Sequence, residues 1–276
     1  MKPNHRIKGN EINSMQSSSV ILVDIGNTST HVSVSRAGNF LLTKHLFSNA
    51  RNVGSVRRLI KYYASRFRID GAILCSVVPG LNRVWISELK KSVSGKVLQV
   101  SHTLNLGVKI DYPKPSAIGA DRLANATAAV EKYGAPVIVA DFGTALTFDI
   151  VSASRAYVGG IIAPGPVFFT DYLAEKTALL PRLPLPAVRN AVLAKKKQTV
   201  IGKDTKQAML IGMRLGYIGI VKEIVLQLQK KKVLKNARLC ATGGYAGIVL
   251  AGSGLGFSID PLLTLRGISR IYRLNS

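Results

Sequence analysis

Two short stretches of the sequence place an aspartate in an Asp-x-Gly turn at the end of an apolar strand. The first is VILVDIGNTSTHVSV at 20–34, with Asp24, and the second is VIVADFGTALTFDIV at 137–151, with Asp141. Backbone N–H groups and hydroxyls in tight turns form concavities that bind anions such as phosphate. The carboxylates repel phosphate, but they are hard oxygen ligands for the Mg²⁺ or monovalent ion that screens it. Two such turns facing each other across a cleft would form a phosphate clamp.

The two stretches also read as an internal repeat. Each predicts a strand, a turn and a second strand, and a repeat of this kind points to duplicated domains. Chance agreement of short strand-turn-strand units stays open as the alternative. Aligned without a gap, the stretches agree at Val20/Val137, Ile21/Ile138, Asp24/Asp141, Gly26/Gly143, Thr30/Thr147 and Val34/Val151.

The elements around these turns alternate between strands and helices, which predicts an α/β fold. The second copy begins at Val137, so we expect a boundary near 132–136, with domains at 20–133 and 134–276. Residues 1–19 are polar and lack periodicity, and we expect them to form a disordered tail. Strand and helix signals lie at 20–47, 51–68, 71–78, 82–94, 96–100, 107–112, 122–133, 204–230 and 237–242, with a Pro- and Lys-rich loop at 181–200.

The charge of the chain is strongly basic, with 38 Lys and Arg against 14 Asp and Glu, a formal +24. This favours acidic partners, nucleic acid included. A solvated surface is the alternative, because residues 51–68 have the pattern of an amphipathic surface helix. No nucleic-acid motif accompanies the basic runs, so nucleic acid is the less favoured partner.

A membrane span and a structural metal site are not expected. The most apolar later segment, 208–228, carries Arg214, Lys222 and Glu223, which makes it a poor membrane span, and no signal peptide precedes Asp24. We therefore expect a cytoplasmic protein. Cys75 and Cys240 lie in apolar surroundings without zinc-ligand spacing, and a Walker phosphate loop and a GxGxxG motif are both absent.

Six motifs in order resemble those of type III pantothenate kinases, in the actin, sugar-kinase and Hsp70-like ATPase superfamily. They are DIGNT at 24–28, YPKPSAIGADR at 112–122, DFGTALTFD at 141–149, GGIIAPG at 159–165, IGKDT at 201–205 and TGG at 242–244. The resemblance implies two duplicated ribonuclease-H-like (actin-like ATPase) domains with a cleft between them. It also implies ATP-dependent phosphorylation of pantothenate to 4′-phosphopantothenate, the first step of coenzyme A biosynthesis.

The resemblance further implies which residues bind ATP and metal ions. Asp24 would lie near Mg²⁺, Asp141 would ligate K⁺ or NH₄⁺, and the glycines of 242–244 would lie by the adenosine. The residues implied to contact ATP are Asp24, Ile25, Gly26, Asn27, Thr28, Ser29, Thr30, His31 and Thr144.

For pantothenate, the resemblance implies Asp121 as the base toward the primary hydroxyl. Similar proteins are homodimers with this site close to the subunit interface. The implied pantothenate contacts are Tyr112, Gly119, Ala120, Asp121, Arg122 and Thr205.

The chemistry of Asp121 and Arg122 agrees with these roles. A carboxylate can orient a hydroxyl and take its proton, and an arginine can bind a carboxylate through two hydrogen bonds. The alternatives are that Asp121 is an ordinary N-cap and Arg122 a solvated first-turn residue. Tyr112 could equally pack on neighbouring prolines, and Thr205 could be a plain first-turn residue. Asp149 could pair with the clamp or face outward.

Two features depart from the family pattern. The family often has Asn where this chain has Asp204, a carboxylate that either weakens binding of an anionic substrate or caps the following helix. The basic excess and the residues before 20 are not family features. A nucleic-acid-binding or transcriptional accessory protein on the same fold is therefore one alternative function, and another small-molecule kinase of the superfamily is the second.

Overall fold

The computed structural model describes residues 19–47, 53–184, 199–251 and 253–276. The described residues form two compact units: one runs to Val100 and includes Ile268–Ser276, and the other is Ser101–Gly267. The contacts thus place residues 101–133 with the second unit, whereas the repeat predicts a boundary near 132–136. The predicted tail, 1–19, lies outside the described residues apart from Ser19, which begins the first strand.

The first unit is a five-stranded sheet with the order β3-β2-β1-β4-β5. Strands β1, β2 and β3 are antiparallel neighbours, and β4 and β5 continue in parallel from β1. Helices α1 and α2 bury their apolar sides, including Ile60, Tyr63 and Trp85, against one face of this sheet. The elements are β1 (Ser19–Ile25), β2 (Ser29–Arg36), β3 (Asn39–Phe47), α1 (Val53–Ala64), β4 (Ile69–Ser76), α2 (Pro79–Lys90) and β5 (Val97–Gln99).

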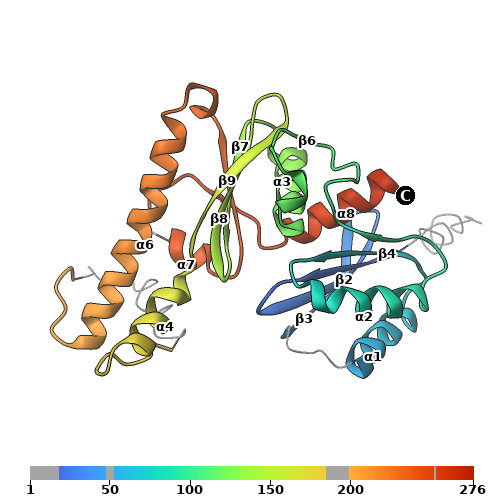
Figure 1. Ribbon diagram of the computed structural model, residues 1–276, viewed down its shortest axis with the longest axis horizontal. Coiled ribbons are helices and arrows are strands. Elements are labelled where there is room, and N and C mark those ends of the chain that lie inside the picture. Colours follow the sequence, from blue (N-terminus) through green and yellow to red (C-terminus); the bar gives the residue numbers. More distant parts are fainter. Residues whose placement is uncertain (1–18, 48–52, 185–198, 252) are drawn as a thin grey trace, which may run out of the picture. The chain divides into compact units, whose positions relative to one another are not determined.

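The second unit is a six-stranded sheet with the order β11-β10-β7-β8-β9-β6. Helices α6 and α7 cover one face, where Tyr217, Val221 and Val249 pack on the sheet, and α3 lies on the other face (Figure 1). The strands are β6 (Lys109–Ile110), β7 (Val137–Phe142), β8 (Ala145–Val151), β9 (Ala156–Pro164), β10 (Arg238–Thr242) and β11 (Ser258–Ile259). The helices are η2 (Pro115–Ala117), α3 (Ala120–Tyr133), α4 (Pro166–Lys176), α6 (Thr205–Gln229), η3 (Lys232–Leu234), α7 (Ala246–Leu250) and the first part of α8 (Leu263–Asn275).

The two sheets share one strand order, which confirms the predicted α/β fold and its duplication. If β7 to β11 take the places of β1 to β5, the order β9-β8-β7-β10-β11 repeats β3-β2-β1-β4-β5, with β6 added at the edge. The turns differ by one residue. Asp24 pairs with His31 in the first hairpin, but Asp141 pairs with Thr147 in the second, so the ungapped alignment is offset by one position beyond the turn.

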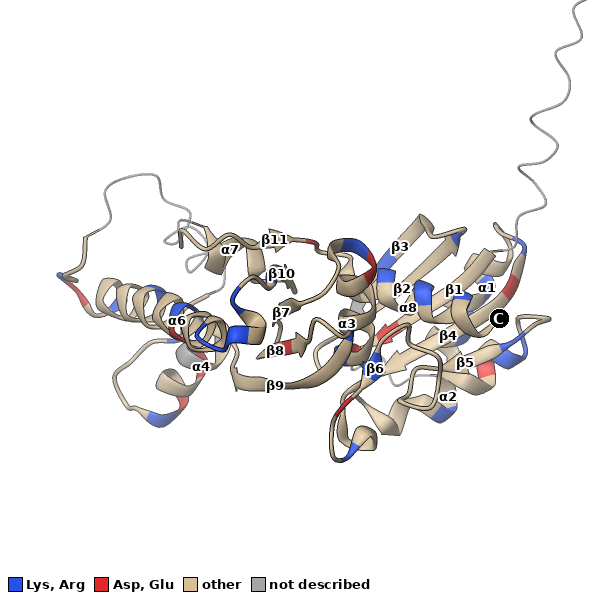
Figure 2. Ribbon diagram, turned by 90° about the horizontal axis from the view of Figure 1, so that it is seen from above, with Lys and Arg blue, Asp and Glu red and all other residues tan. Residues whose placement is uncertain are grey.

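Lys and Arg are spread over helices and strands of both units, and acidic residues are few (Figure 2). The predicted amphipathic helix is present as α1, which ends at Ala64, four residues before the predicted end at 68, and the predicted positions 51–52 lie outside the described residues. Its buried residues include Val56, Leu59 and Ile60, as the spacing predicts. Within the described ranges, the helices are too short or too polar to cross a membrane.

Candidate active site

The first Asp-x-Gly turn joins β1 to β2 and contains most of the predicted ATP contacts. The turn is closed by Gly26, whose backbone N–H donates to the Ser29 carbonyl at 2.9 Å. The Asp24 carboxylate lies at the strand end, with its Oδ2 atom 3.6 Å from Nδ1 of His31. The side chains of Asn27 and Thr28 are exposed.

Two other predicted ATP contacts in this hairpin, Ile25 and Thr30, have side chains that point into the protein. Ile25 and Thr30 are paired across the hairpin, and their side chains are buried within the first unit. Of the predicted contacts at these two positions, only the backbone can therefore face a ligand. His31 also lies against His45 with ring centroids 4.7 Å apart, and burial, together with His31, lowers the pKa of His45.

The second Asp-x-Gly turn is where three of the six sequence motifs meet. Its Gly143 N–H donates to the Ala145 carbonyl at 3.1 Å, and Thr144 is exposed. Gly165, the last residue of GGIIAPG, lies so close that a Cβ there would stand 2.6 Å from the Gly143 carbonyl oxygen. Gly243 of TGG has a φ of +91°, and a Cβ there would stand 2.6 Å from Oδ1 of Asp141. Only glycine allows these close approaches.

Asp141 is held from helix α3 by a residue that the sequence did not single out. Asn125, fully buried, donates from Nδ2 to Oδ2 of Asp141 at 2.9 Å. Its Oδ1 accepts a hydrogen bond of 2.8 Å from the Thr264 hydroxyl. Asn125 follows Asp121 by four residues, so both lie on one side of α3; that spacing is the signal that could have identified it.

Asp121 occupies the first turn of α3. Its Oδ1 accepts a hydrogen bond of 2.8 Å from the backbone N–H of Arg122, at the helix end where the macrodipole favours an anion. The N-cap is Gly119, so the interpretation of Asp121 as an ordinary N-cap is wrong. A Cβ on Gly119 would lie 2.6 Å from this carboxylate oxygen, and the glycine thus leaves room for it. Ala120 is the first helical residue.

Arg122 is not a solvated residue, because only 15% of its side chain is exposed. Its Nε donates to Oδ1 of Asp149 at 2.6 Å, and its Nη2 donates to the Phe148 carbonyl at 3.3 Å. Asp149 is fully buried, so the outward alternative for this residue is also wrong. Burial raises the pKa of Asp149 to about 7, against the opposing effects of Arg122 and Tyr157. Burial acts to lower the pKa of Arg122, but the charge of Asp149, together with its hydrogen bond and the nearby Tyr157 and Asp121, outweighs it and raises that pKa.

Tyr112 lies next to this ion pair. Its ring meets that of Tyr157 edge-on, with centroids 6.2 Å apart and an interplanar angle of 74°. A Cβ on Gly159 would be 3.7 Å from the Tyr112 ring. Tyr112 therefore packs on strand β9, and 38% of it is exposed. Tyr112, Asp121 and Arg122 thus gather at one edge of the second unit.

Thr205 is the one predicted pantothenate contact that lies elsewhere in this unit. It is the first residue of α6, which covers the sheet face opposite α3 (Figure 1). Within the described residues, no hydrogen bond joins Thr205 to Tyr112 or Arg122. The carboxylate of Asp204 accepts from the Gln207 N–H at 2.8 Å, so Asp204 caps the helix.

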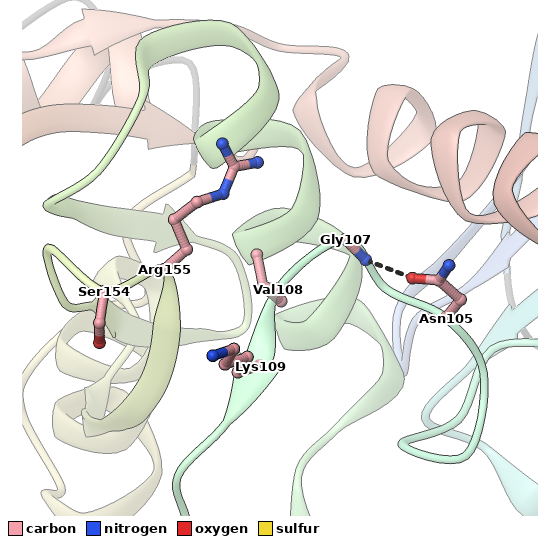
Figure 3. Close-up of a pocket in the computed structure, with 6 residues that line it drawn as sticks. All are labelled: Asn105, Gly107, Val108, Lys109, Ser154 and Arg155. Atoms are coloured by element: carbon pink, nitrogen blue, oxygen red, sulfur yellow. Dashed lines mark hydrogen bonds between the residues drawn. The ribbon is translucent and has the colours of Figure 1, made fainter.

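A pocket of about 260 Å³ in the same unit lies apart from these residues. It is formed where the segment before β6 meets the turn between β8 and β9 (Figure 3). It contains none of the predicted site residues, and its lining is Asn105, Gly107, Val108, Lys109, Ser154 and Arg155. The geometry of Asp121, Arg122 and Asp141, whose side chains suit the expected chemistry, is therefore the better guide to the candidate active site.

The residues present fit a nucleotide–metal complex better than a dedicated metal cage. In the described part of the chain, no three His, Cys, Asp or Glu residues come together. Asp24 and Asp141 each supply one carboxylate at a glycine turn. Mg²⁺ with a nucleotide is commonly held by one or two carboxylates together with phosphates and water, and the single carboxylate at each turn suits such an ion.

Comparisons with a family model and with individual proteins point to the same family. A family model described as type III pantothenate kinase matches residues 20–227. The chain is 36% identical over 271 residues to a type III pantothenate kinase from Dehalococcoides mccartyi, covering 94% of this chain and 99% of the relative. It is 40% identical over 255 residues to one from Akkermansia muciniphila, covering 92% and 98%.

Solved structures share the fold at lower identity. MreB 5 of Spiroplasma citri bound to AMPPNP has a TM-score of 0.54 and 10% identity, covering 94% of this chain and 97% of that one. A ROK family glucokinase from Streptomyces griseus in complex with glucose and AMPPNP has a TM-score of 0.53 and 14% identity, covering 94% and 99%. A protein described as a Baf family transcriptional activator from Campylobacter jejuni has a TM-score of 0.56 and 20% identity, covering 92% and 97%. These likenesses place the chain in the actin-like ATPase fold.

Proposed function

Because the chain belongs to the type III pantothenate kinase family, we propose that it transfers a phosphoryl group from ATP to the primary hydroxyl of pantothenate. The product is 4′-phosphopantothenate, the first intermediate toward coenzyme A. One observation carries the proposal from the structure. Helix α3 presents Asp121 and Arg122 at its first turn and, through Asn125, holds Asp141 beside three motif glycines.

Asp121 is proposed as the base. Phosphoryl transfer passes through a loose transition state, so positioning and charge neutralisation dominate. A carboxylate that accepts the hydroxyl proton orients the nucleophile and contributes about 10²–10⁴-fold. The Asp121 carboxylate is supported at the N-terminus of α3 by the Arg122 N–H, which fixes it in one orientation.

Arg122 is proposed to bind the carboxylate of pantothenate. Its Nε side is already occupied by Asp149 and its Nη2 by the Phe148 carbonyl. Nη1 has no hydrogen bond within the described residues. The end of the guanidinium that includes Nη1 is therefore the part that can meet the substrate, and Tyr112 would line the same site.

The proposed ATP contacts are the hairpin residues Asp24 to His31 and Thr144. Exposed side chains of Asn27, Thr28 and Thr144, with turn N–H groups, supply the polar atoms. Asp24 would hold Mg²⁺, which neutralises phosphate charge when bound. Asp141 would hold K⁺ or NH₄⁺, because its carboxylate is fixed by Asn125 and lies against the backbone at Gly243.

We also propose that the protein is a homodimer with Thr205 and the pantothenate site near the interface. Exposed apolar side chains on α4 and α6 support an interface, since Phe168 and Tyr172 stack with centroids 5.2 Å apart and remain about half exposed. Leu215 and Leu226 of α6 are exposed as well. Sedimentation of the purified protein tests this; a monomer at micromolar concentration would contradict it.

A substrate panel tests the proposed reaction. ADP release is measured with ATP, Mg²⁺ and K⁺ in the presence of pantothenate, glucose, glycerol or no acceptor, and the product is identified by mass. We expect release to require pantothenate and the product to gain one phosphoryl group. Release that follows another acceptor would assign the chain to a different small-molecule kinase activity.

A second candidate function rests on the +24 charge. Basic residues on both units would suit a nucleic-acid-binding or transcriptional accessory role (Figure 2). Binding of this kind weakens steeply as salt rises. Titration of duplex DNA at 50 and 200 mM salt tests it, and no binding at the higher salt would remove this candidate.

A further inference from the structure

The mechanism above leaves unused the buried pair formed by Asp149 and Tyr157 behind Arg122. The Tyr157 hydroxyl donates to Oδ1 of Asp149 at 2.9 Å, and this oxygen also accepts from Arg122. Burial and the charge of Asp149 raise the pKa of Tyr157, so its hydroxyl keeps the proton that it donates. Strands β8 and β9 thus place a fixed acceptor against the first turn of α3.

We propose that Asp149 and Tyr157 are positioning residues, which hold the Arg122 guanidinium in the orientation that binds the carboxylate of the substrate. The inference rests on the proposed function, because it assigns Arg122 to the acid end of pantothenate. An arginine side chain has several rotatable bonds, and fixing its fork before binding lowers the cost of ordering it. The two hydrogen bonds from Nε and Nη2 of Arg122 hold one side of the guanidinium and leave the Nη1 end for the ligand.

The surrounding sequence is shaped for this arrangement. Gly160 pairs with Asp149 across β8 and β9, and a Cβ at this position would collide with Nη2 of Arg122 and with the Phe148 carbonyl oxygen. The second glycine of GGIIAPG therefore makes room for the guanidinium. Arg122 lies between Gly160 and the helix turn that carries Asp121. An ion pair that served stability alone would not require this position.

The pair also differs from the other buried ion cluster in this unit. Asp260 is 4% exposed and binds Lys132 at 2.6 Å and Arg266 at 3.0 Å. It accepts the Leu262 N–H as well, and these contacts tie the start of α8 to α3. Asp260 thus provides a matched control, a buried carboxylate with cationic partners outside the proposed site.

Steady-state kinetics with three variants test the proposal. Asp149→Asn removes the charge, Tyr157→Phe removes only the hydroxyl, and Asp260→Asn is the control. Hydrogen bonds to charged groups are the strong ones, so we expect Asp149→Asn to raise KM for pantothenate about 10- to 100-fold. Tyr157→Phe should raise it by a smaller factor, and KM for ATP should stay within about 2-fold in both.

A substrate without the carboxylate separates positioning from stability. Pantothenol carries a hydroxyl in place of the acid, so its kcat/KM should fall much less than that of pantothenate in Asp149→Asn. Asp260→Asn should lower the unfolding temperature while it leaves the preference for pantothenate unchanged. If Asp149→Asn does not fold, Tyr157→Phe gives the same readout.

The outcomes distinguish the two proposals. An active wild-type protein whose Asp149→Asn and Tyr157→Phe variants keep its KM for pantothenate would overturn the positioning role alone. Equal losses with pantothenate and pantothenol would assign the pair to stability and overturn it too. A wild-type protein without pantothenate-dependent turnover would overturn the proposed function, and with it the role of Asp149.

Discussion

Asn125 donates a hydrogen bond of 2.9 Å from Nδ2 to Oδ2 of Asp141, which ties helix α3 to the end of strand β7. The same helix presents Asp121 one turn earlier. The proposed base and the proposed cation ligand therefore belong to one rigid arrangement within the second unit. A change at Asn125 should affect the proposed cation site without altering any group proposed to contact the substrates.

The first prediction concerns this contact. Asn125→Ala should raise the K⁺ concentration for half-maximal activity about 10-fold, because groups that orient metal ligands typically contribute 10- to 100-fold to metal affinity. It should also cost about 1–3 kcal/mol of stability, since two buried hydrogen bonds are lost. Activity against K⁺ concentration measures the first effect, and urea unfolding measures the second.

Thr264→Val is the matched control for Asn125. It removes the hydroxyl that donates to Oδ1 of Asn125 at 2.8 Å but leaves the bond to Asp141. We expect a smaller rise in the K⁺ requirement. An unchanged K⁺ dependence in Asn125→Ala would contradict the role of Asn125 in holding Asp141.

The second prediction concerns Gly160. A Cβ here would strike Nη2 of Arg122 and the Phe148 carbonyl, so Gly160→Ala should raise KM for pantothenate and destabilise the protein by about 1–3 kcal/mol, as overpacking does. Gly212→Ala is the control, because open space surrounds Gly212 in α6. Alanine there should stabilise the helix by about 0.5–1 kcal/mol. An unchanged KM for pantothenate in Gly160→Ala would contradict the claim that substrate binding requires the observed orientation of Arg122.

The third prediction concerns pH. Burial raises the pKa of Asp149 to about 7, and the charged groups that face it are Arg122 and Asp121 from α3. The ionised form of Asp149 holds Arg122, so KM for pantothenate should fall as pH rises from 6 to 8, by about 10-fold for a single group of this pKa. The dependence should vanish in Asp149→Asn. A KM that is flat across this range in the wild-type protein would contradict the account.

The effect of Asp149 on stability has the opposite direction. The folded pKa lies above the ordinary value of 3.8, so the folded state holds a proton that the unfolded state releases between these values. The contribution of Asp149 to the free energy of unfolding is therefore fully present below about pH 4 and is lost as pH rises through about 7. Thermal unfolding of the wild type should show this decline, and Asp149→Asn should lack it. Equal pH profiles for the two proteins would contradict the assignment.

The sequence predicts much of this architecture because its signals are local. Two apolar strands that end in Asp-x-Gly define the hairpins at Asp24 and Asp141, and the repeat between them predicts the duplicated sheets. The first turn of α3 follows from the segment that ends in Asp121 and Arg122. Each of these depends on neighbours in the chain, and the structure contains each of them.

The features that the sequence did not reveal depend on long-range contacts. Alternation along β8 does not say which face is covered, so the burial of Asp149 required the position of α3. Asp141, to which Asn125 donates, lies 16 residues away on another element. The second hairpin is one residue tighter than the first, which an ungapped alignment cannot detect. The role of Gly160 appears only when Arg122 is placed opposite it.

The central claim is that Asp121 acts as the base in the phosphorylation of pantothenate. The most direct test is a coupled ADP-release assay with pantothenate, ATP, Mg²⁺ and K⁺, run on the wild-type protein and on Asp121→Asn. We expect turnover that requires pantothenate, and a loss of about 10²–10⁴-fold in kcat for the variant with ATP binding retained. A variant with near-normal kcat, or a wild-type protein that releases no ADP with pantothenate, would contradict the claim.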